Sequence, residues 1–490
     1  MKIREKITLE NCIKWFAALC TVSFLVSSIP VIYSLYRPLL MLSVLFGAGL
    51  LLWLFLVDRR VYRRPFFPIF FLFCVSYFVT ILLNRQNSFF SNCGQLVYTG
   101  FYFFIFFCVF STLDRDSRSA TFKMICRIVF VFSMAAALIS LGMMLARYSV
   151  DVPYRGSTIT IGFNRRSVGM QLTGVSSGPS SLSELCLLGI FSAWYLFGRK
   201  EVRRLGLYVV SCVIYLFTIG AANAYAALIA MLAFSVLYPL CRDIGDTAGK
   251  KAPRRCAEAV AQMLVFCLLA TGVFYGTQRI ETAAVNGISQ AVYQHQLKEA
   301  EKEQPEQPEE PEEPEEPAQP ELPEEPEEPA QPELPEQPSE VTISRPLETS
   351  ATGSRSAIWR EGIKLFLSHP LGVTNSAIYV EVPSADSVYE FRNLHNGYLT
   401  LLASSGIIGF ALILVFGIWF FIKAMFSLYS CRDGSKRLLL SVLIATCGAI
   451  LATDLVNGCF VLWRGLEYMF LWLLLGEICA QITEPSPGKK

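Results

Sequence analysis

The chain has 490 residues, 53% of them hydrophobic and 13% aromatic, and its mean hydropathy is +0.44. This composition, with repeated apolar runs of about 20 residues, excludes a soluble globular domain and predicts a protein embedded in the lipid bilayer. The net charge of +2 is the sum of an acidic segment and a basic remainder, because residues 303–340 hold 16 Glu and no Lys or Arg. Removing those 16 from the 40 acidic residues leaves 24 against 42 Lys and Arg elsewhere. We expect no nucleic acid as a partner.

Apolar segments of about 20 residues predict twelve membrane-spanning helices. They begin near residues 12, 38, 65, 94, 124, 181, 204, 221, 257, 399, 438 and 460. No small-residue cleavage site follows the first segment, so we interpret it as a helix and not as a removable signal peptide. The predicted fold class is an all-α polytopic membrane protein with about 12 transmembrane helices, nine within residues 1–275 and three within residues 397–490.

Basic residues are distributed unevenly among the connections between these helices. Segments on the side of the N-terminus contain 26 Lys and Arg, whereas the short connections on the other side contain only Arg37, Arg85 and Arg464. Because Lys and Arg accumulate in cytoplasmic connections, this contrast predicts that both termini are cytoplasmic. An outer loop at residues 149–180 and a large extracytoplasmic loop between helices 9 and 10, residues 276–396, then face the outside.

The large loop contains a Pro/Glu-rich segment, residues 303–340. Twelve prolines occur at every third position from Pro305 to Pro338, which suits the three residues per turn of a polyproline II helix. The sequence PAQPELPE occurs twice, which indicates growth by duplication. One interpretation is an arm that binds peptidoglycan or a partner protein. We favour the other, a solvated spacer inserted where the chain tolerates insertions.

An amphipathic helix is predicted after this spacer, over residues 355–369. Its apolar side chains fall at helical spacing, with Ser354 as N-cap and Pro370 as the stop, and we expect it to lie on the outer membrane surface. Arg355 would then occupy the first turn. There, free backbone N–H groups and a guanidinium group can bind an anion together.

Four short motifs occur in this part of the chain in a fixed order. They are G-S-R-x-x-x-W (residues 353–359), H-P-L-G (369–372), H-N-G-Y-L (395–399) and S-G-I-I-G (405–409). Together, over about residues 353–417, they resemble the O-antigen ligase and Wzy-type polymerase superfamily. The stretch QLTGVSSGPSSLSELCLLGI is similar to a second family element, but Gln171 and Ser180 or Ser181 stand where Arg and Asn are usual. Arg165 and Arg166, a few residues upstream, are candidate replacements.

The resemblance implies a glycosyltransferase that uses an undecaprenyl-pyrophosphate-linked glycan, on the outer face of the cytoplasmic membrane, without a metal ion or other cofactor. Breaking the anomeric C–O bond develops negative charge on the pyrophosphate, which arginine side chains stabilise because they stay charged and donate forked hydrogen bonds. Arg355 is the predicted catalytic cation. Candidate substrate-binding cations are Arg165, Arg166, Arg360, Arg392 and Arg464.

His395 is the predicted catalytic base. It is one of only three histidines, and an imidazole takes up and releases a proton near neutral pH. The alternative is that His395 only caps the following helix or hydrogen-bonds Asn396 or Tyr398. In the catalytic interpretation, Asn396 and Tyr398 belong to the substrate-binding residues. The charged residues Asp454, Arg464 and Glu467, near the outer ends of the last two helices, either line the acceptor cavity or pair with one another.

Several functions remain open within and beyond this resemblance. We favour a polymerase of surface or capsular polysaccharide, which needs only lipid-linked repeat units; the alternative within the family is an O-antigen-type or protein O-glycan ligase. Other classes are a twelve-helix transporter or flippase, and a non-catalytic scaffold whose acidic arm recruits wall-building proteins. The expected partners are the lipid-linked glycan, the lipid bilayer and other proteins of envelope polysaccharide assembly.

Overall fold

The computed structural model describes most of the chain. The described residues are 8–64, 66–166, 169–198, 202–219, 252–303, 339, 341–343, 349–383, 388–455, 458 and 461–483. The helix expected near residue 221 and nearly all of the Pro/Glu-rich segment lie outside them.

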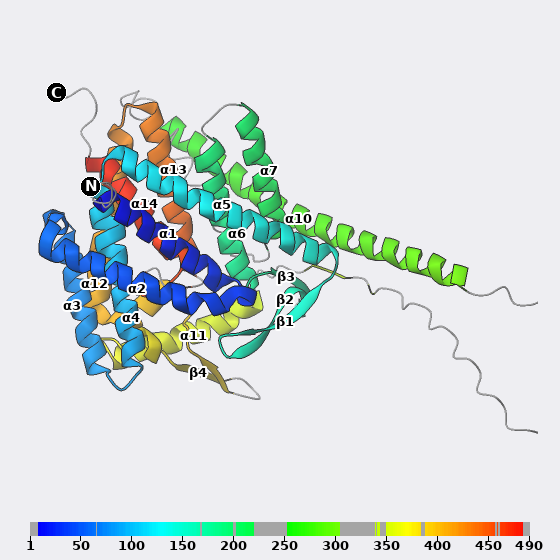
Figure 1. Ribbon diagram of the computed structural model, residues 1–490, viewed down its shortest axis with the longest axis horizontal. Helices are drawn as coiled ribbons and strands as arrows, with labels where there is room; N and C mark the ends of the chain where they lie inside the picture. The colour runs from blue at the N-terminus through cyan, green and yellow to red at the C-terminus, as the bar shows by residue number, and fades with distance from the viewer. Residues whose placement is uncertain are drawn as a thin grey trace, which may run out of the picture.

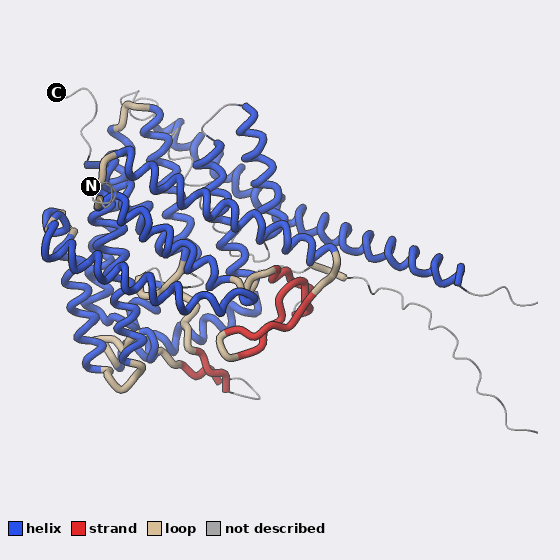
Figure 2. Tube along the Cα trace, viewed as in Figure 1, coloured by secondary structure: helices blue, strands red, loops and turns tan. Residues whose placement is uncertain are grey.

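The described chain is mostly helical (Figures 1 and 2). The helices are α1 (Leu9–Ser28), α2 (Tyr36–Trp53), α3 (Phe67–Leu83), α4 (Phe89–Gly100), α5 (Arg115–Leu145), α6 (Pro179–Ala193), α7 (Val202–Thr218), α10 (Ala252–Glu303), α11 (Thr349–Ser368), α12 (Gly397–Ser430), α13 (Gly434–Thr453) and α14 (Leu466–Thr483). Short 3-10 or π-helical segments occur at Pro30–Leu35, Leu54–Asp58, Arg60–Arg63, Phe101–Val109, Phe110–Thr112, Trp194–Gly198 and Asn375–Ala377. In the described part, 8 helical segments are long and apolar enough to cross a membrane, and Phe67–Leu83 and Arg204–Thr218 are shorter apolar helices. The protein is therefore a polytopic, mostly helical membrane protein.

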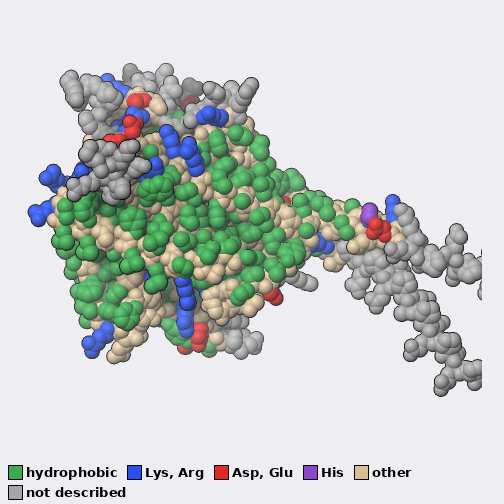
Figure 3. Space-filling model, in the orientation of Figure 1, with side chains coloured by type: hydrophobic (Ala, Val, Ile, Leu, Met, Phe, Trp, Pro, Cys, Tyr) green, Lys and Arg blue, Asp and Glu red, His purple; other side chains and the backbone are tan. Residues whose placement is uncertain are grey.

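Polar side chains mark where several of these helices begin. Thr8, Asp114, Asn396 and Asp433 each accept a hydrogen bond from a backbone N–H in the first turn of α1, α5, α12 and α13 respectively. Such N-caps satisfy donors that have no partner within the helix. Apolar side chains cover the middle of the molecule, while Lys and Arg lie mostly above and below this band (Figure 3). This arrangement suits a body surrounded by lipid.

The two loops that we expect outside the membrane contain β-strands, so the all-α prediction is incomplete. Residues 149–180 hold a three-stranded antiparallel sheet of β1 (Ser149–Tyr154), β2 (Ser157–Arg166) and β3 (Gly169–Gly174), and the large loop holds the hairpin of β4 (Val380–Pro383) and β5 (Val388–Phe391). The stretches SVDVPY and STITIGF alternate β-branched with polar residues, which is the pattern of a half-buried strand. This two-residue alternation gives a weaker signal in the sequence than the long apolar runs of the helices.

Two helices of the large loop differ from their predicted bounds. α10 continues to Glu303, well past the predicted loop start at residue 276, because no proline interrupts it before Pro305. α11 begins at Thr349, so Arg355 lies in its second turn, where backbone N–H groups are already bonded within the helix. The expectation that Arg355 and free N–H groups of a first turn bind an anion together is therefore wrong. The predicted stop before Pro370 is confirmed, since α11 ends at Ser368.

The helix α12 is interrupted, and the H-P-L-G segment docks into the interruption. Gly406 has non-helical backbone angles, with φ of 69°. The backbone N–H groups of Val373 and Thr374 donate to the carbonyl oxygens of Ala403 and Ser404, over 2.9 and 3.1 Å. Backbone groups that the break leaves without helical partners are thus satisfied, as their burial requires.

The molecule has two distinct ends. α1 begins and α14 ends at one of them, which we call the terminal end (Figure 1). The strands and α11 lie toward the opposite end, which we call the strand end. The site described next is built at the strand end.

Candidate functional site

A cavity of about 1450 Å³ lies at the strand end. Its walls come from the end of α1 and the segment after it, the start of α2, α4, the β1–β2 turn, the start of α6 and the loop before α14. Much of the lining is Ser and Tyr. The charged lining residues are Arg37, Arg155, Arg392 and Arg464, with Glu184 and Glu467. The cavity therefore combines apolar surface with hydroxyl groups and an excess of positive charge.

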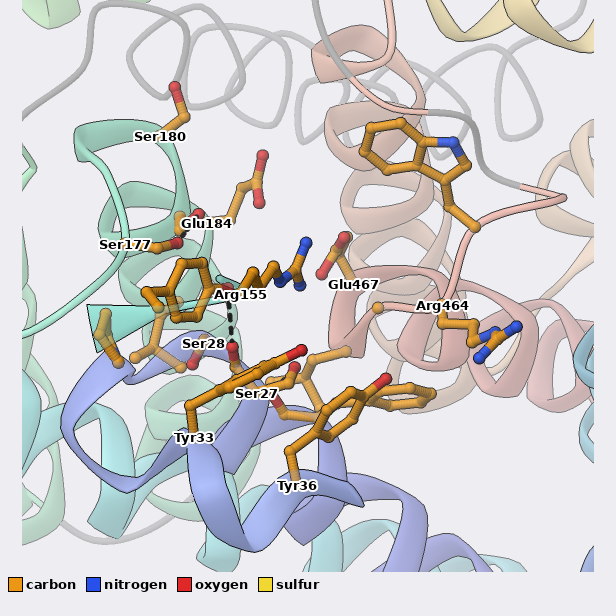
Figure 4. Close-up of a pocket in the computed structure, with 18 of the residues that line it drawn as sticks. Ser27, Ser28, Tyr33, Tyr36, Arg155, Ser177, Ser180, Glu184, Arg464 and Glu467 are labelled. Atoms are coloured by element: carbon orange, nitrogen blue, oxygen red, sulfur yellow. Dashed lines mark hydrogen bonds between the residues drawn. The ribbon is translucent and has the colours of Figure 1, made fainter. Parts of the chain in front are cut away.

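Arg155 reaches the cavity from the tip of the β1–β2 hairpin (Figure 4). Arg155 and Gly156 have φ of 52° and 85°, as in a two-residue turn that follows the twist of its strands. The Tyr154 hydroxyl donates to the Ser27 carbonyl over 3.1 Å, which ties the hairpin to the end of α1. The Arg155 guanidinium carbon lies 5.0 Å from the Tyr154 ring centroid and 5.7 Å from that of Tyr33. Aromatic rings thus hold this cation, and no carboxylate of a described residue lies within ion-pair distance.

Arg464 is held on the other side by the loop before α14. Its guanidinium group donates to the Ser91 carbonyl over 3.3 Å, and the guanidinium carbon lies 5.4 Å from the Tyr98 ring centroid. The Tyr102 hydroxyl donates to the Trp463 carbonyl over 3.1 Å and fixes the loop itself. The guanidinium group is therefore positioned before any ligand binds.

The two carboxylates of the cavity come from the first turn of α14 and the second turn of α6. Glu467 lies at the start of α14 and Glu184 near the start of α6. Figure 4 shows Glu467 and Arg155 pointing toward one another. Arg464 and Glu467 line the cavity, and among the described residues neither they nor Asp454 form an ion pair with one another. This favours the cavity-lining alternative for Arg464 and Glu467.

Asp454 is buried behind the cavity wall, directly after the last residue of α13. Only 2% of the residue is exposed, and the Tyr468 hydroxyl lies 3.4 Å from its Oδ1. Its Oδ2 has no hydrogen-bond partner among the described residues. Burial, and to a lesser degree the nearby Glu467, raises the pKa of the Asp454 carboxyl well above its usual range. Asp454 is not among the residues that line the cavity.

The H-N-G-Y-L motif joins the start of α12 to the end of α13. Asn396, not His395, caps α12, because its Oδ1 accepts from the Leu399 N–H over 2.9 Å. The Asn396 side chain also donates to the Leu455 carbonyl over 3.2 Å, and the Tyr398 hydroxyl donates to a carbonyl of α13 over 3.0 Å. His395 has φ of 47°, and its backbone N–H donates to an Asn393 side chain. His395, Asn396 and Tyr398 lie outside the cavity lining, and their roles in catalysis and binding stay predictions.

The remaining predicted cations divide into three groups. Arg392 lines the cavity together with Arg464. Arg355 and Arg360 lie on α11 and do not line it; Arg360 pairs with Glu361 at 3.7 Å. Arg165 and Arg166 end β2, and their side chains lie outside what the structure describes.

Sequence reasoning missed several residues of the cavity. In the sequence, Arg37 is only evidence for orientation, and no motif assigns a role to Arg155, Tyr33 or Tyr154. A signal for Arg155 was present, because Arg-Gly separates two stretches of strand-like alternation. The Tyr33 contact had no such signal, since it joins segments far apart in the sequence.

The O-antigen ligase family model matches residues 167–414, just over half of the chain. The chain belongs to the O-antigen ligase family. Members of this family are glycosyltransferase-like membrane enzymes, either ligases or polymerases, that act on lipid-linked glycans. No curated protein matches the chain. The matched range includes α6, α11 and the break in α12, whereas α1, α2, α4 and the loop before α14, which complete the cavity, lie outside it.

Proposed function

We propose that this O-antigen ligase family protein polymerises a surface or capsular polysaccharide. It would transfer a glycan from an undecaprenyl-pyrophosphate carrier to a hydroxyl group of a second lipid-linked glycan, on the outer face of the cytoplasmic membrane. The observation that carries the proposal is the cavity at the strand end, lined by Arg37, Arg155, Arg392 and Arg464. Family membership supports the same class of reaction.

Arginine side chains suit the leaving group of this reaction. As the anomeric C–O bond breaks, charge accumulates on the pyrophosphate, and fixed guanidinium groups stabilise that charge without rearranging. Arg155 and Arg464 are both held in place by aromatic rings, and Arg464 also by the Ser91 carbonyl. In the proposed mechanism these cations, and not a metal ion, bind the pyrophosphate.

The topology belongs to the same proposal. We assign about twelve spans, with both termini in the cytoplasm and the strand end outside. The uneven distribution of Lys and Arg supports this orientation. The common position of the start of α1 and the end of α14 agrees with it, since an even number of spans returns the chain to the side where it began.

The function is tested with purified protein in lipid nanodiscs, supplied with lipid-linked repeat units and a chelator. We expect longer glycans to form. Arg155→Lys and Arg464→Lys keep the charge but lose the planar fork, so their rates should fall roughly ten- to a hundredfold. Arg279→Lys, on exposed α10 outside the cavity, is the matched control and should match the wild type.

Other outcomes would identify other functions or sites. Addition of one glycan to a different lipid or protein acceptor, with no chain growth, would identify the ligase alternative. Full activity of both cavity variants, combined with inactive Arg355→Lys, would move the pyrophosphate site to α11. No transfer by the wild-type protein from any lipid-linked donor would refute the proposed function.

A further inference from the structure

We infer that one corner of the cavity binds the first sugar of the donor, the sugar that is attached to the pyrophosphate. This inference rests on the proposed function and deepens it by naming a sugar subsite. The corner is formed by Ser91 and Gln95 of α4 together with Asn375 and Trp463, all of which line the cavity. We call it the tryptophan corner. Of its four residues, only Asn375 lies within the family-matched range.

Trp463 is held at the polar edge of its ring and at its backbone. The indole N–H donates to the Asn375 Oδ1 over 3.3 Å, and the backbone carbonyl accepts from the Tyr102 hydroxyl over 3.1 Å. Trp463 is half-buried, and no aromatic ring of a described residue stacks on it, whereas Trp472 stacks on Phe416 with the ring centroids 5.8 Å apart. A flat apolar face therefore remains for a ligand in the cavity.

Amide and hydroxyl groups lie beside this aromatic face. The Asn375 Nδ2 donates to no described residue, because the indole bond occupies only its Oδ1. The Gln95 Oε1 accepts from the Tyr77 hydroxyl over 3.4 Å, and the Ser91 hydroxyl accepts from that of Ser376 over 3.2 Å. An amide oxygen has two lone pairs and a hydroxyl can also donate, so both groups keep capacity for a ligand. The corner thus offers donors and acceptors without a charge of its own.

The Asn375 side of the corner is fixed by helices α3 and α4. The Asn375 backbone N–H donates to the Tyr77 hydroxyl over 3.3 Å, and the Ser376 backbone N–H donates to the Asn92 Oδ1 over 3.2 Å. A ligand therefore finds these groups already placed, which lowers the entropic cost of binding.

The corner lies directly beside Arg464. The guanidinium group donates to the Ser91 carbonyl over 3.3 Å, and a Cβ atom added at Gly94 would lie 2.7 Å from one of its nitrogens. The cation is therefore placed over the turn of α4 that carries Ser91 and Gln95. In the proposed reaction Arg464 binds the pyrophosphate, to which the first sugar is joined through a single oxygen atom. A sugar ring attached there lies next to the corner.

The chemistry of the corner suits a sugar ring better than the other parts of the donor. A pyranose has an apolar face of C–H groups, which packs on an aromatic ring, and hydroxyl groups at its edge, which bond to amides and hydroxyls. The lipid chain would leave those polar groups without partners. A phosphate group binds most strongly to cations, which the corner itself lacks.

The test measures the binding of two ligands to the protein in nanodiscs. One is undecaprenyl pyrophosphate; the other also carries the first sugar, joined through a CH2 group in place of the anomeric oxygen so that no transfer occurs. The wild type should bind the sugar-bearing ligand more tightly. Trp463→Leu keeps an apolar side chain but loses the flat face, so the affinity for that ligand should fall roughly five- to tenfold, with little change for undecaprenyl pyrophosphate.

Two further variants support this comparison. Trp463→Phe restores a flat ring and should recover part of the lost affinity. Trp15→Leu is the matched control, since Trp15 is 62% exposed on α1 and does not line the cavity, and it should bind both ligands as the wild type does.

Asn375→Ala guards against misfolding of Trp463→Leu. It should also weaken only the sugar-bearing ligand, and retained affinity for undecaprenyl pyrophosphate shows that a variant is folded. Unchanged affinities in both variants would overturn the inference. An equal loss for both ligands would also overturn it, because Trp463 would then contact the carrier and not the sugar. Failure of the proposed function would appear separately, as absence of transfer by the wild type in the activity assay.

Discussion

At the residue scale, the arginines of the cavity and a buried arginine are held in different ways. Arg155 and Arg464 line the cavity, where aromatic rings hold both and the Ser91 carbonyl also accepts a hydrogen bond from Arg464. Arg118 is different, since it is 1% exposed and its Nε lies 2.8 Å from the Glu477 carboxylate, which also accepts from Gln481 over 2.7 Å. This buried pair links α5 to α14 and therefore has a structural role.

We predict that Glu477→Gln destabilises the protein by about 3–5 kcal/mol, because it leaves the Arg118 charge buried without its counter-charge. The double variant with Arg118→Met should recover part of this loss. Glu361→Gln removes a partner from an exposed pair with Lys364 of the same 2.8 Å length, and should cost less than about 1 kcal/mol. Denaturant unfolding in detergent measures all three. Equal effects of the buried and the exposed change would contradict this account.

At the element scale, two family motifs form one structural unit. The H-P-L-G segment turns at Gly372, with φ of 88°, and S-G-I-I-G interrupts α12 at Gly406, with φ of 69°. Each glycine lies where the other segment's backbone approaches: a Cβ at Gly372 would lie 2.5 Å from the Ser404 carbonyl oxygen, and one at Gly406 would lie 2.4 Å from the Leu371 carbonyl carbon. Thr80 of α3 and Asn84, the residue that follows α3, donate to carbonyls of the same turn.

Alanine at either glycine should therefore destabilise the protein. We expect Gly372→Ala and Gly406→Ala each to cost roughly 1–3 kcal/mol from backbone strain alone, with a further loss from the close contacts. Gly417→Ala, in the same helix but with nothing within 4 Å of its added Cβ, should be neutral or slightly stabilising. Thermal unfolding in detergent distinguishes these outcomes, and an unchanged Gly406→Ala midpoint would argue against the docking.

At the scale of the whole molecule, the chain returns to the body soon after the Pro/Glu-rich segment. Asn286 of α10 exchanges hydrogen bonds with Val341, over 2.9 and 3.0 Å, and Gln278 donates to the Ile343 carbonyl over 2.6 Å. Met170 of β3 pairs with Ile343. The site-forming part of the large loop is therefore anchored to α10 and β3 independently of the segment that precedes it.

Replacing residues 304–338 should thus leave glycan transfer largely intact. From Asn286 to Glu303, α10 rises about 25 Å, so a flexible linker of about twelve Gly and Ser residues spans the gap. Asn286→Ala removes the hydrogen bonds to Val341 but keeps the Pro/Glu-rich segment, and it should lower activity more than the linker replacement does. The nanodisc assay compares the two at equal membrane abundance. Polymer formation that stopped in the linker variant alone would make the segment part of the mechanism.

The proposed orientation predicts which surfaces are accessible from outside the cell. A cysteine at Gln294, on exposed α10, should react with a membrane-impermeant thiol reagent in intact cells, whereas one at Ser435, in the first turn of α13, should react only after permeabilisation. A background without other accessible cysteines serves as the control. The reverse labelling pattern would invert the topology, and reaction of both sites in intact cells would contradict the assignment of spans.

The sequence by itself determined the features that depend on local patterns. Apolar length predicted a polytopic helical protein, and motif order predicted the family that the family model confirms. The stop of α11 before Pro370 followed in the same way. Each of these features depends on the composition or spacing of residues that are close together in the sequence, so no contact between distant segments is needed to predict it. The predicted start of α11, after an N-cap at Ser354, was wrong because Ser354 lies inside a longer helix that begins at Thr349.

Only the tertiary structure decided which side chains meet. The cavity combines Arg155 from a hairpin tip, Arg464 from the last connection, Glu467 from the start of α14, and Tyr33 from the segment after α1. Tyr154 bonds to Ser27, more than a hundred residues away, and Trp463 to Asn375. Packing between distant segments creates such contacts, so a motif can name the family while the charged residues around the cavity follow from how the helices assemble.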